Sequence, residues 1–227
     1  MSKELVNELE DILLSNYTYI KQHGYIGYDP QVYWYLPLTI RAKSNPTFIN
    51  KVLRKVEVTV LNKYPKLLSY YLKIIKMDGQ ELVPYGLGIF IQAHLNFYQY
   101  FRDDEYLREA IKVSNKLESL LVRLPNGLGV PNSKKDKSIK FFNNFTDNNT
   151  SYLPSGAEAF NGFWRLYCTT DDEKYLETAK LIGNSFLYDF NIKNIENNKK
   201  VIDYSNINDS THVLNANALA ASCLSIL

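Results

Sequence analysis

Apolar residues recur at helical spacing along much of the 227-residue chain, and this pattern predicts a largely helical protein. Residues 4–20 place their leucines, isoleucine and one tyrosine near one face, and residues 47–63 carry apolar side chains at i, i+4 steps. Pro65 interrupts the second segment, and residues 67–75 favour a further short helix. We expect the first helix to end near Gly24, because glycine is the usual residue just past a helix.

The sequence then repeats. Two segments, residues 86–121 and 156–187, share the same order of an apolar helix, a polar turn and an amphipathic helix. Their common string is Asp-Asp-Glu, then Tyr-Leu, then Ala three residues on, starting at Asp103 and at Asp171, an offset of 68 to 69 residues. The aspartate is expected to cap the second helix, and Tyr-Leu-x-x-Ala to form its buried stripe.

Similar helical hairpins predict a helical-repeat fold, because each repeat buries its apolar face only against its neighbours. Another apolar helix is predicted at residues 211–227, with no second helix after it. We therefore expect an all-α fold with helical hairpins that form a partial (α/α) toroid, and we expect a truncated product, the alternative being that another chain covers this surface. The predicted single domain spans residues 1–227, with N-terminal helices at 1–84 and repeats at 85–125, 152–190 and 211–227.

Long polar connections separate the predicted repeats. Residues 126–151 are rich in Asn, Lys and Ser and are longer than the ~2–8 residues typical of a helix connection. Loops of this length are usually functional or disordered. Residues 191–200 are interpreted as a solvated turn. Minor β-ribbons are expected near residues 141–144 or 201–204.

Charge and cysteine content narrow the classes of function. Lys+Arg 26 against Asp+Glu 24 gives a net charge of +2, which argues against a dedicated nucleic-acid binder and gives no reason to expect a polybasic membrane patch. Two cysteines form neither a disulfide framework nor a Cys-based zinc site. Neither a signal peptide nor a run of ~20 apolar residues that would span a bilayer is present, and we expect a cytoplasmic protein.

The strongest concentration of candidate chemistry lies in residues 203–217, directly before and within the last predicted helix. Asp209 or Ser210 is expected to cap this helix, with His212 in its first turn, where the positive end of the helix favours an anionic group. The predicted catalytic and binding side chains of this segment are Asp203, Tyr204, Asp209, His212, Asn215 and Asn217. The alternative is that the string only caps the helix and fixes the hairpin geometry.

Further candidates lie elsewhere along the chain. Paired carboxylates carry glycosidic chemistry, and Asp29 and Glu158 join Asp203 and Asp209 as candidates. Aromatic rings stack on sugars, and aromatic residues make up 14% of the chain. The candidate rings are Trp34, Tyr85, Tyr152, Trp164 and Tyr204, with Tyr85 and Tyr152 just before the apolar helices. His94 is interpreted as a core histidine and His23 as a helix-end residue; no His pair has metal-ligand spacing, so neither a metal nor another cofactor is expected.

These residues resemble the (α/α) toroids, a group that includes the six-hairpin glycosidases and the N-acylglucosamine 2-epimerases. More specifically, the chain is similar to a toroid family encoded beside capsular and exopolysaccharide biosynthesis genes. The similarity runs from about Gly24 to the end and rests on three motifs: Tyr28-Asp29-Pro30, Gly86-Leu87-Gly88-Ile89-Phe90, and the string Asp203-Tyr204-Ser205 through Asp209, Thr211-His212-Val213 and Asn215-Ala216-Asn217. The resemblance implies a saccharide ligand, with Tyr28 among the binding residues. The chain looks shorter than this family and would lack the closing hairpins.

Two functions follow as hypotheses. The first is a toroid protein that binds a saccharide, or acts on it as a hydrolase, lyase or epimerase, in cell-surface polysaccharide biosynthesis. The second is a non-catalytic helical-repeat scaffold that binds protein partners. Isoprenoid chemistry ranks last, because an Asp-rich diphosphate motif is missing.

Overall fold

The computed structural model of the protein describes residues 3–28, 36–74, 80–132, 150–195, 199–207 and 211–227. Within these residues the helices are α1 (Lys3–Gln22), α2 (Pro37–Ser44), α3 (Phe48–Lys63), α4 (Pro65–Ile74), α5 (Pro84–Phe101), α6 (Asp104–Glu118), α7 (Leu153–Thr170), α8 (Glu173–Tyr188) and α9 (Leu214–Leu224). Short antiparallel ribbons pair β1 (Ile26–Tyr28) with β2 (Gln80–Leu82), β3 (Val122–Arg123) with β4 (Leu128–Gly129), and β5 (Ile192–Ile195) with β6 (Lys199–Ile202). The predicted all-α class with minor β-ribbons is confirmed.

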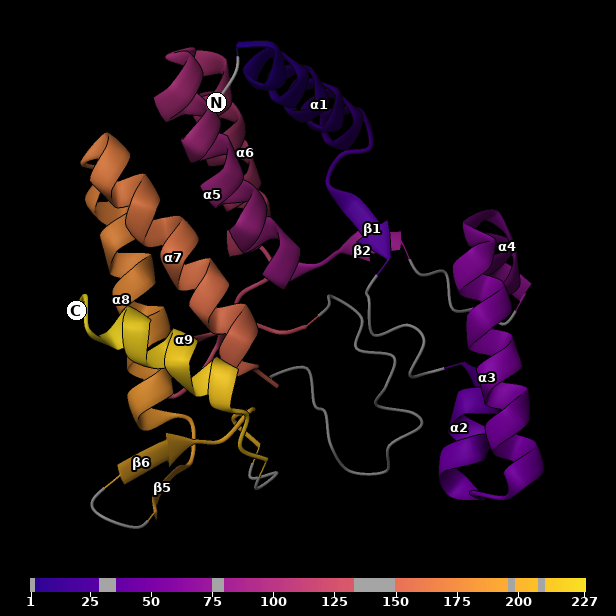
Figure 1. Cartoon of the computed structure of the whole chain (residues 1–227). Coiled ribbons are helices and arrows are strands. Elements are labelled where there is room, and N and C mark those ends of the chain that lie inside the picture. Colours follow the sequence, from indigo (N-terminus) through magenta and orange to yellow (C-terminus); the bar gives the residue numbers. More distant parts are fainter. Residues whose placement is uncertain (1–2, 29–35, 75–79, 133–149, 196–198, 208–210) are drawn as a thin grey trace.

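The two predicted hairpins are α5–α6 and α7–α8, which pack side by side (Figure 1). Each turn uses one residue in the left-handed backbone region, Arg102 with φ 57° and Asp171 with φ 55°. An aspartate caps each second helix: the side chains of Asp103 and Asp172 accept hydrogen bonds from the backbone N–H groups of Glu105 and Lys174, at 2.8 and 3.2 Å. The repeat in sequence is therefore a repeat in structure, as the capping residues predicted.

The first helices of the hairpins, α5 and α7, run parallel and at the same depth. Near their N-terminal ends Gly88 lies so close to α7 that a Cβ atom there would be 2.6 Å from the carbonyl carbon of Glu158. About two turns further along, Arg165 donates a hydrogen bond of 2.6 Å to Asn96. Both Asn96 and Arg165 are the thirteenth residue of their helix, so the two helix starts lie at one end of the bundle.

The second helices bury the tyrosine and the alanine of the predicted Tyr-Leu-x-x-Ala stripe, and its leucines, Leu107 and Leu176, are partly buried. Tyr106 and Ala110 of α6 are buried, as are Tyr175 and Ala179 of α8. Ala110, Tyr175 and Ala179 belong to one continuous apolar cluster that extends from α5 to α9 and includes the fully buried ring of Phe160. Burying a side chain of that size stabilises the fold by about 1.5–3 kcal/mol.

Helix α9 packs against α7 through a stripe of small side chains and crosses its lower part in Figure 1. Ala216, Ala220 and Cys223 are buried there. The prediction that this helix begins near residue 211 is wrong, since α9 begins at Leu214. The carbonyl of Thr211 accepts a hydrogen bond of 2.8 Å from Tyr204 N, which keeps residues 211–213 out of the helix. His212 therefore precedes the first turn, and Val213, not Asp209 or Ser210, is the N-cap residue.

Residues 191–200 are also more ordered than predicted. The proposed solvated turn contains strand β5 and the first half of β6, with Ile192 paired to Ile202 and Ile195 to Lys199. Ile202 packs against the core cluster, and its backbone N–H and C=O both bond to the side chain of Asn217, at 2.7 and 2.9 Å. Tertiary contacts at one end of the ribbon thus order a segment whose composition is that of a loop.

Ribbon β1–β2 leads from the bundle to helices α2, α3 and α4, which form a second unit at one side (Figure 1). Gly24, with φ 68°, ends α1 as predicted. The next residue, Tyr25, is buried, and its hydroxyl lies 2.9 Å from both His94 Nε2 and Glu109 Oε2. The α2–α4 unit has a small core of its own, made of Leu36, Leu61, Leu68 and Leu72.

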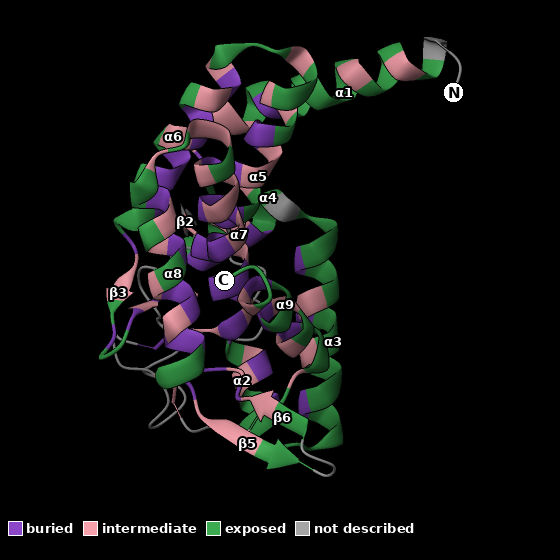
Figure 2. Cartoon of the chain, turned by 90° about the vertical axis from the view of Figure 1, so that its left-hand side faces the viewer, coloured by how far each residue is buried: buried purple, intermediate pink, exposed green. Residues whose placement is uncertain are grey.

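Burial differs sharply between these parts (Figure 2). The bundle has buried positions along each of its helices, whereas α1 and α3 are mostly exposed. Across the helices that the structure describes, none is long and apolar enough to cross a membrane.

Candidate functional site

The segment that precedes α9 lies against the N-terminal end of α7. Leu153, the first residue of α7, donates its backbone N–H to the carbonyl of Tyr204 at 2.9 Å, and Tyr152 forms a β-bridge with Ser205. Asn206 continues the contact, since its side chain accepts a hydrogen bond of 2.7 Å from Ser151 N. Part of the predicted string is thus placed at the rim of the bundle, next to the start of an apolar helix.

Asp203 is the most unusual residue of this rim, because its carboxylate is fully buried. The backbone carbonyl of Asn191 accepts a hydrogen bond of 3.0 Å from the backbone N–H of Asp203. The side-chain amide of Asn191 donates a second bond, of 2.9 Å, to Asp203 Oδ2. The other oxygen, Oδ1, has no hydrogen-bond partner among the described residues. Buried polar atoms that lack a hydrogen bond are rare, and a catalytic role is one of the explanations for them.

Two cationic or ionisable groups face that oxygen. His212 Nδ1 lies 3.1 Å from Asp203 Oδ1, and Lys193 Nζ lies 3.5 Å from it. Both side chains are about one-third exposed, at 35% and 34%. A buried carboxylate therefore contacts an imidazole that also reaches solvent, which is the arrangement of an acid–base pair.

Aromatic rings border the same place. Tyr152 and Tyr204 contact each other edge to face, with ring centroids 6.0 Å apart and an interplanar angle of 66°. Both rings are partly exposed. The predicted ring Trp164 lies further along α7, where it packs partly buried against the core. Tyr152 and Tyr204 are the two predicted rings that the structure brings together.

The two predicted asparagines have different roles. Asn217 holds the backbone of Ile202, as described above, so the expected bond from one asparagine to a neighbouring segment is confirmed. Asn215 is exposed, and its side chain accepts a hydrogen bond of 3.0 Å from the N–H of its neighbour Ala216. Asn217 is consequently a positioning residue for the segment that carries Asp203.

Glu158 belongs to a different contact. It lies in the second turn of α7, and its Oε2 accepts a hydrogen bond of 2.9 Å from Gln92 of α5. Among the described residues, no hydrogen bond or ion pair joins Glu158 to Asp203 or His212. Tyr85 is the second residue of α5 rather than the residue before it, and its ring is partly exposed.

Other predicted residues fall outside the description. Asp29, Trp34 and Asp209 lie outside the described residues. Tyr28 is the last residue of β1, where its backbone pairs with Gln80, and nothing further is described of it. The predicted pairing of carboxylates stays a prediction.

Sequence reasoning missed three side chains: Asn191, Lys193 and Gln92. The first two were hidden in the segment interpreted as a solvated turn. The sequence did contain a sign of this contact. Asn191 and Asp203 lie on either side of a polar turn, and a β-hairpin brings such residues opposite each other. Gln92 contacts Glu158 because α5 and α7 begin at the same level and lie side by side. The offset between the two repeats in the sequence indicated that such residues would be neighbours.

A buried polar cluster inside the bundle involves the predicted core histidine. His94 is 2% exposed and bonds through Nε2 to Tyr25, while Nδ1 has no partner among the described residues. Burial lowers the pKa of His94 to about 4, although the Glu109 carboxylate opposes this shift. The interpretation of His94 as a core residue is confirmed.

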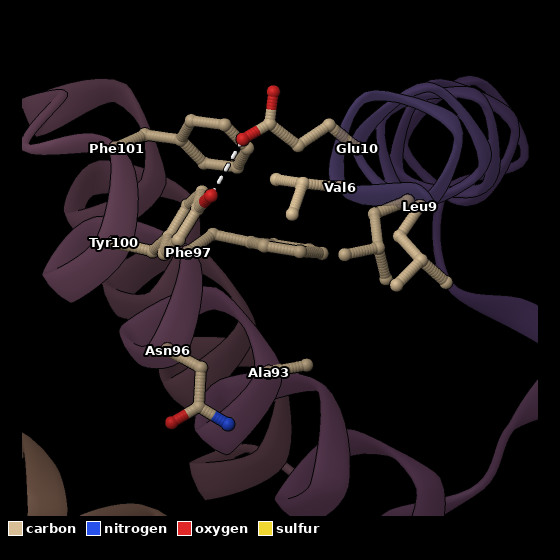
Figure 3. Close-up of a pocket in the computed structure, with 9 residues that line it drawn as sticks. Val6, Leu9, Glu10, Ala93, Asn96, Phe97, Tyr100 and Phe101 are labelled. Atoms are coloured by element: carbon tan, nitrogen blue, oxygen red, sulfur yellow. Dashed lines mark hydrogen bonds between the residues drawn. The ribbon is translucent and has the colours of Figure 1, made fainter. Parts of the chain in front are cut away.

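A separate hollow of about 450 Å³ lies between α1 and α5 (Figure 3). Apolar side chains dominate its lining, and Glu10 accepts a hydrogen bond of 2.5 Å from the Tyr100 hydroxyl at its edge. Its lining residues are Val6, Leu9, Glu10, Leu13, Ala93, Asn96, Phe97, Tyr100 and Phe101. None of the predicted site residues is among them. The part of the chain that the structure describes contains no group of three or more His, Cys, Asp or Glu residues that could hold a metal ion.

No protein-family model, curated protein or solved structure matches the chain. A functional hypothesis for this chain therefore depends on the geometry of the rim.

Proposed function

We propose that the protein binds a saccharide at the rim where residues 204–206 meet the N-terminal end of α7, and acts on it through Asp203 and His212. The observation that carries the proposal is the fully buried Asp203 carboxylate 3.1 Å from an imidazole that reaches solvent. The partly exposed rings of Tyr152 and Tyr204 support it, because aromatic faces stack on sugar rings and phenol hydroxyls bond to sugar hydroxyls.

The pair suits proton transfer. A carboxylate beside Nδ1 favours the tautomer with its proton on that nitrogen, and leaves Nε2 to accept a proton from a substrate. A small rotation of the imidazole would turn the 3.1 Å contact between Nδ1 and Oδ1 into a hydrogen bond. The nearby Lys193 cation would attract an anionic sugar such as a uronate.

Among the three reaction types, lyase or epimerase chemistry is supported more than hydrolysis. On a uronate, both begin when a base removes the proton on the carbon next to the carboxylate, and the Asp203–His212 pair would be that base. A lyase then expels the O4 substituent, which takes up a proton as it leaves, whereas an epimerase returns a proton from water or a second acid to the opposite face. Glycoside hydrolysis uses two carboxyl groups that flank the bond, and Glu158 is bonded to Gln92 instead of facing Asp203. A role in cell-surface polysaccharide biosynthesis, in the cytoplasm, completes the proposal on the strength of the family resemblance and of the parallel helical hairpins.

The test compares His212→Gln with Lys200→Gln, a control on strand β6 whose side chain is exposed. Binding and turnover of a panel of neutral and uronate-containing oligosaccharides would be measured by calorimetry and product analysis. We expect His212→Gln to lower turnover by at least ~100-fold, the usual scale of a lost acid–base group, with an unchanged unfolding temperature. Lys200→Gln should retain activity. Full activity of His212→Gln across every saccharide that the unmodified protein turns over would contradict the proposal.

A second candidate, a scaffold for protein partners, is favoured by the exposed apolar residues of α1. Leu5, Leu9, Ile12 and Leu13 are each 42–50% exposed. Substituting Leu5 and Ile12 by serine would weaken capture of such a partner and leave saccharide binding intact. For His212→Gln, the first candidate predicts weaker action on the saccharide and unchanged capture of a protein partner.

A further inference from the structure

Basic and acidic residues are unevenly distributed along the chain, although its total charge is close to neutral. Residues 37–74, which comprise α2, α3 and α4, contain eight lysines and arginines and a single carboxylate, Glu57, for a net charge of +7. The remaining residues hold 18 basic and 23 acidic side chains, for a net charge of −5. One small unit therefore carries an excess of positive charge that the total of +2 does not reveal.

The positive charge of this unit lies on its surface. Glu57 is 8% exposed, and its Oε1 accepts a hydrogen bond of 2.8 Å from Tyr71, so it faces inward. Six of the basic side chains are exposed and make no ion pair within the described residues: Arg41, Lys51, Lys55, Lys63, Lys66 and Lys73. Burial and the positive charge of Arg54 lower the pKa of Lys43, which shows that like charges are crowded here.

The same unit leaves an apolar helix face uncovered. Phe48, Val52, Val56 and Val60 follow one another at i, i+4 steps along α3 and are 81%, 44%, 54% and 37% exposed. Ile49 and Leu53 widen the stripe, at 68% and 38%. The side of α3 that faces its own unit instead buries two polar residues, Asn50 and Glu57, beside Leu61.

Apolar and basic residues together indicate what covers this face. A nucleic acid would take the charge, but it offers no burial for a stripe of valines with Phe48 and Ile49. An apolar protein groove would bury the stripe, but it would leave six exposed cations unused. An anionic bilayer takes both, because apolar side chains enter the acyl boundary while lysines contact the headgroups.

We propose that the α2–α4 unit binds an anionic membrane surface, with α3 lying in the interface and its Phe48–Val60 stripe turned toward the acyl chains. The exposed rings of Tyr64, between α3 and α4, and of Tyr70, within α4, fit the headgroup level, where tyrosine is enriched. The proposal goes beyond saccharide recognition, which takes place on the other unit of the chain.

The test is co-sedimentation of the full-length chain with vesicles of phosphatidylcholine alone and of phosphatidylcholine with phosphatidylglycerol at 3:1. We expect binding to the anionic vesicles, at least tenfold weaker binding to the neutral ones, and a steep loss as salt is raised, because surface charge is screened. Since each basic residue near the surface contributes about 1 kcal/mol, Lys51→Gln with Lys55→Gln and Lys66→Gln should weaken binding roughly 100-fold.

Matched variants separate the two contributions. Phe48→Ser with Ile49→Ser should weaken binding at least tenfold, because two large side chains no longer enter the acyl boundary. Lys199→Gln with Lys200→Gln, and Tyr188→Ser on α8, remove exposed charge and an exposed ring from the bundle and should leave vesicle binding unchanged. Since the substituted side chains are exposed, a circular dichroism melt should match that of the unmodified protein.

Several results would overturn the proposal. Equal binding to both vesicle types, or anionic binding that survives the Phe48 and Lys51 variants, would contradict it. So would sedimentation velocity showing that the stripe is buried in a dimer that Phe48→Ser dissociates while vesicles bind neither form. Saccharide binding is measured without vesicles, so either proposal can fail alone.

Discussion

The bundle and the α2–α4 unit use helices of similar length in opposite ways. In α7 the apolar residues face neighbouring helices, and Phe160 and Phe163 are at most 1% exposed. In α3 the longest apolar stripe faces away from the unit, and Phe48 is 81% exposed. Helical periodicity predicts that a stripe exists, but a single chain does not define what the stripe will contact.

The largest expected difference between the two regions is the response to losing a phenylalanine. Phe160→Ala should destabilise the protein by about 3–5 kcal/mol, because it leaves a cavity in a closed core. Phe48→Ala should change the free energy of unfolding by less than about 0.5 kcal/mol, since its ring is mostly in water. Urea unfolding of both variants measures this. Similar losses from the two substitutions would mean that the stripe of α3 is covered within the chain.

A smaller effect is expected where the helices of the bundle touch. Gly88→Ala should cost about 2–3 kcal/mol, because its Cβ atom would meet the backbone of Glu158 and Ala159 at 2.6–2.8 Å, and backbone yields little. Gly86→Ala is the control, since the nearest atoms there lie 4.0 Å away. It should be neutral or stabilise α5 slightly. Thermal melts that rank the two variants in the reverse order would contradict the close approach of α5 to α7.

The smallest expected effect is a pH dependence of stability that comes from His94. This residue bonds to Tyr25, directly before β1, where the chain leaves the bundle for the α2–α4 unit. Burial lowers the pKa of His94 to about 4, below the ~6.5 of an unfolded chain. The unfolded state therefore takes up this proton first, and stability present above about pH 6.5 is lost as the pH falls toward 4. Between pH 7.5 and 5 we expect a loss of about 2 kcal/mol from this residue.

Urea unfolding at the two pH values measures this loss. His94→Gln should reduce it by about 2 kcal/mol, whereas His23→Gln, which removes an exposed imidazole, should leave it in place. An identical pH dependence in His94→Gln and the unmodified protein would show that His94 is not held neutral by burial.

Much of the bundle was predictable from local rules. Capping aspartates, the glycine after α1 and the Tyr-Leu-x-x-Ala stripe each act within one or two turns, and all three were found where expected. The start of α9 was not predictable, because it depends on a bond between Thr211 and Tyr204 that only the folded chain brings together. The apolar run alone gave no sign of that bond.

The candidate site was also predicted only in part, because local patterns identify some of its residues and others meet only in the folded chain. Asp203, His212, Tyr204 and Asn217 lie within one string, and their types indicated polar chemistry. Asn191 and Lys193 reach Asp203 only through the β5–β6 ribbon, whose pairing joins residues of loop-like composition. Glu158 bonds to Gln92 of the neighbouring repeat, and this contact between two repeats is not visible in the sequence around either residue.

The glycine contact between α5 and α7 has a consequence for how this sequence can change over time. Because the two backbones meet at Gly88, neither helix can slide along the other, and positions 69 apart, such as Asn96 and Arg165, remain at one level. A substitution on one helix then alters the surroundings of its counterpart 69 residues away. Related sequences should accordingly record compensating exchanges at this separation along the two helices.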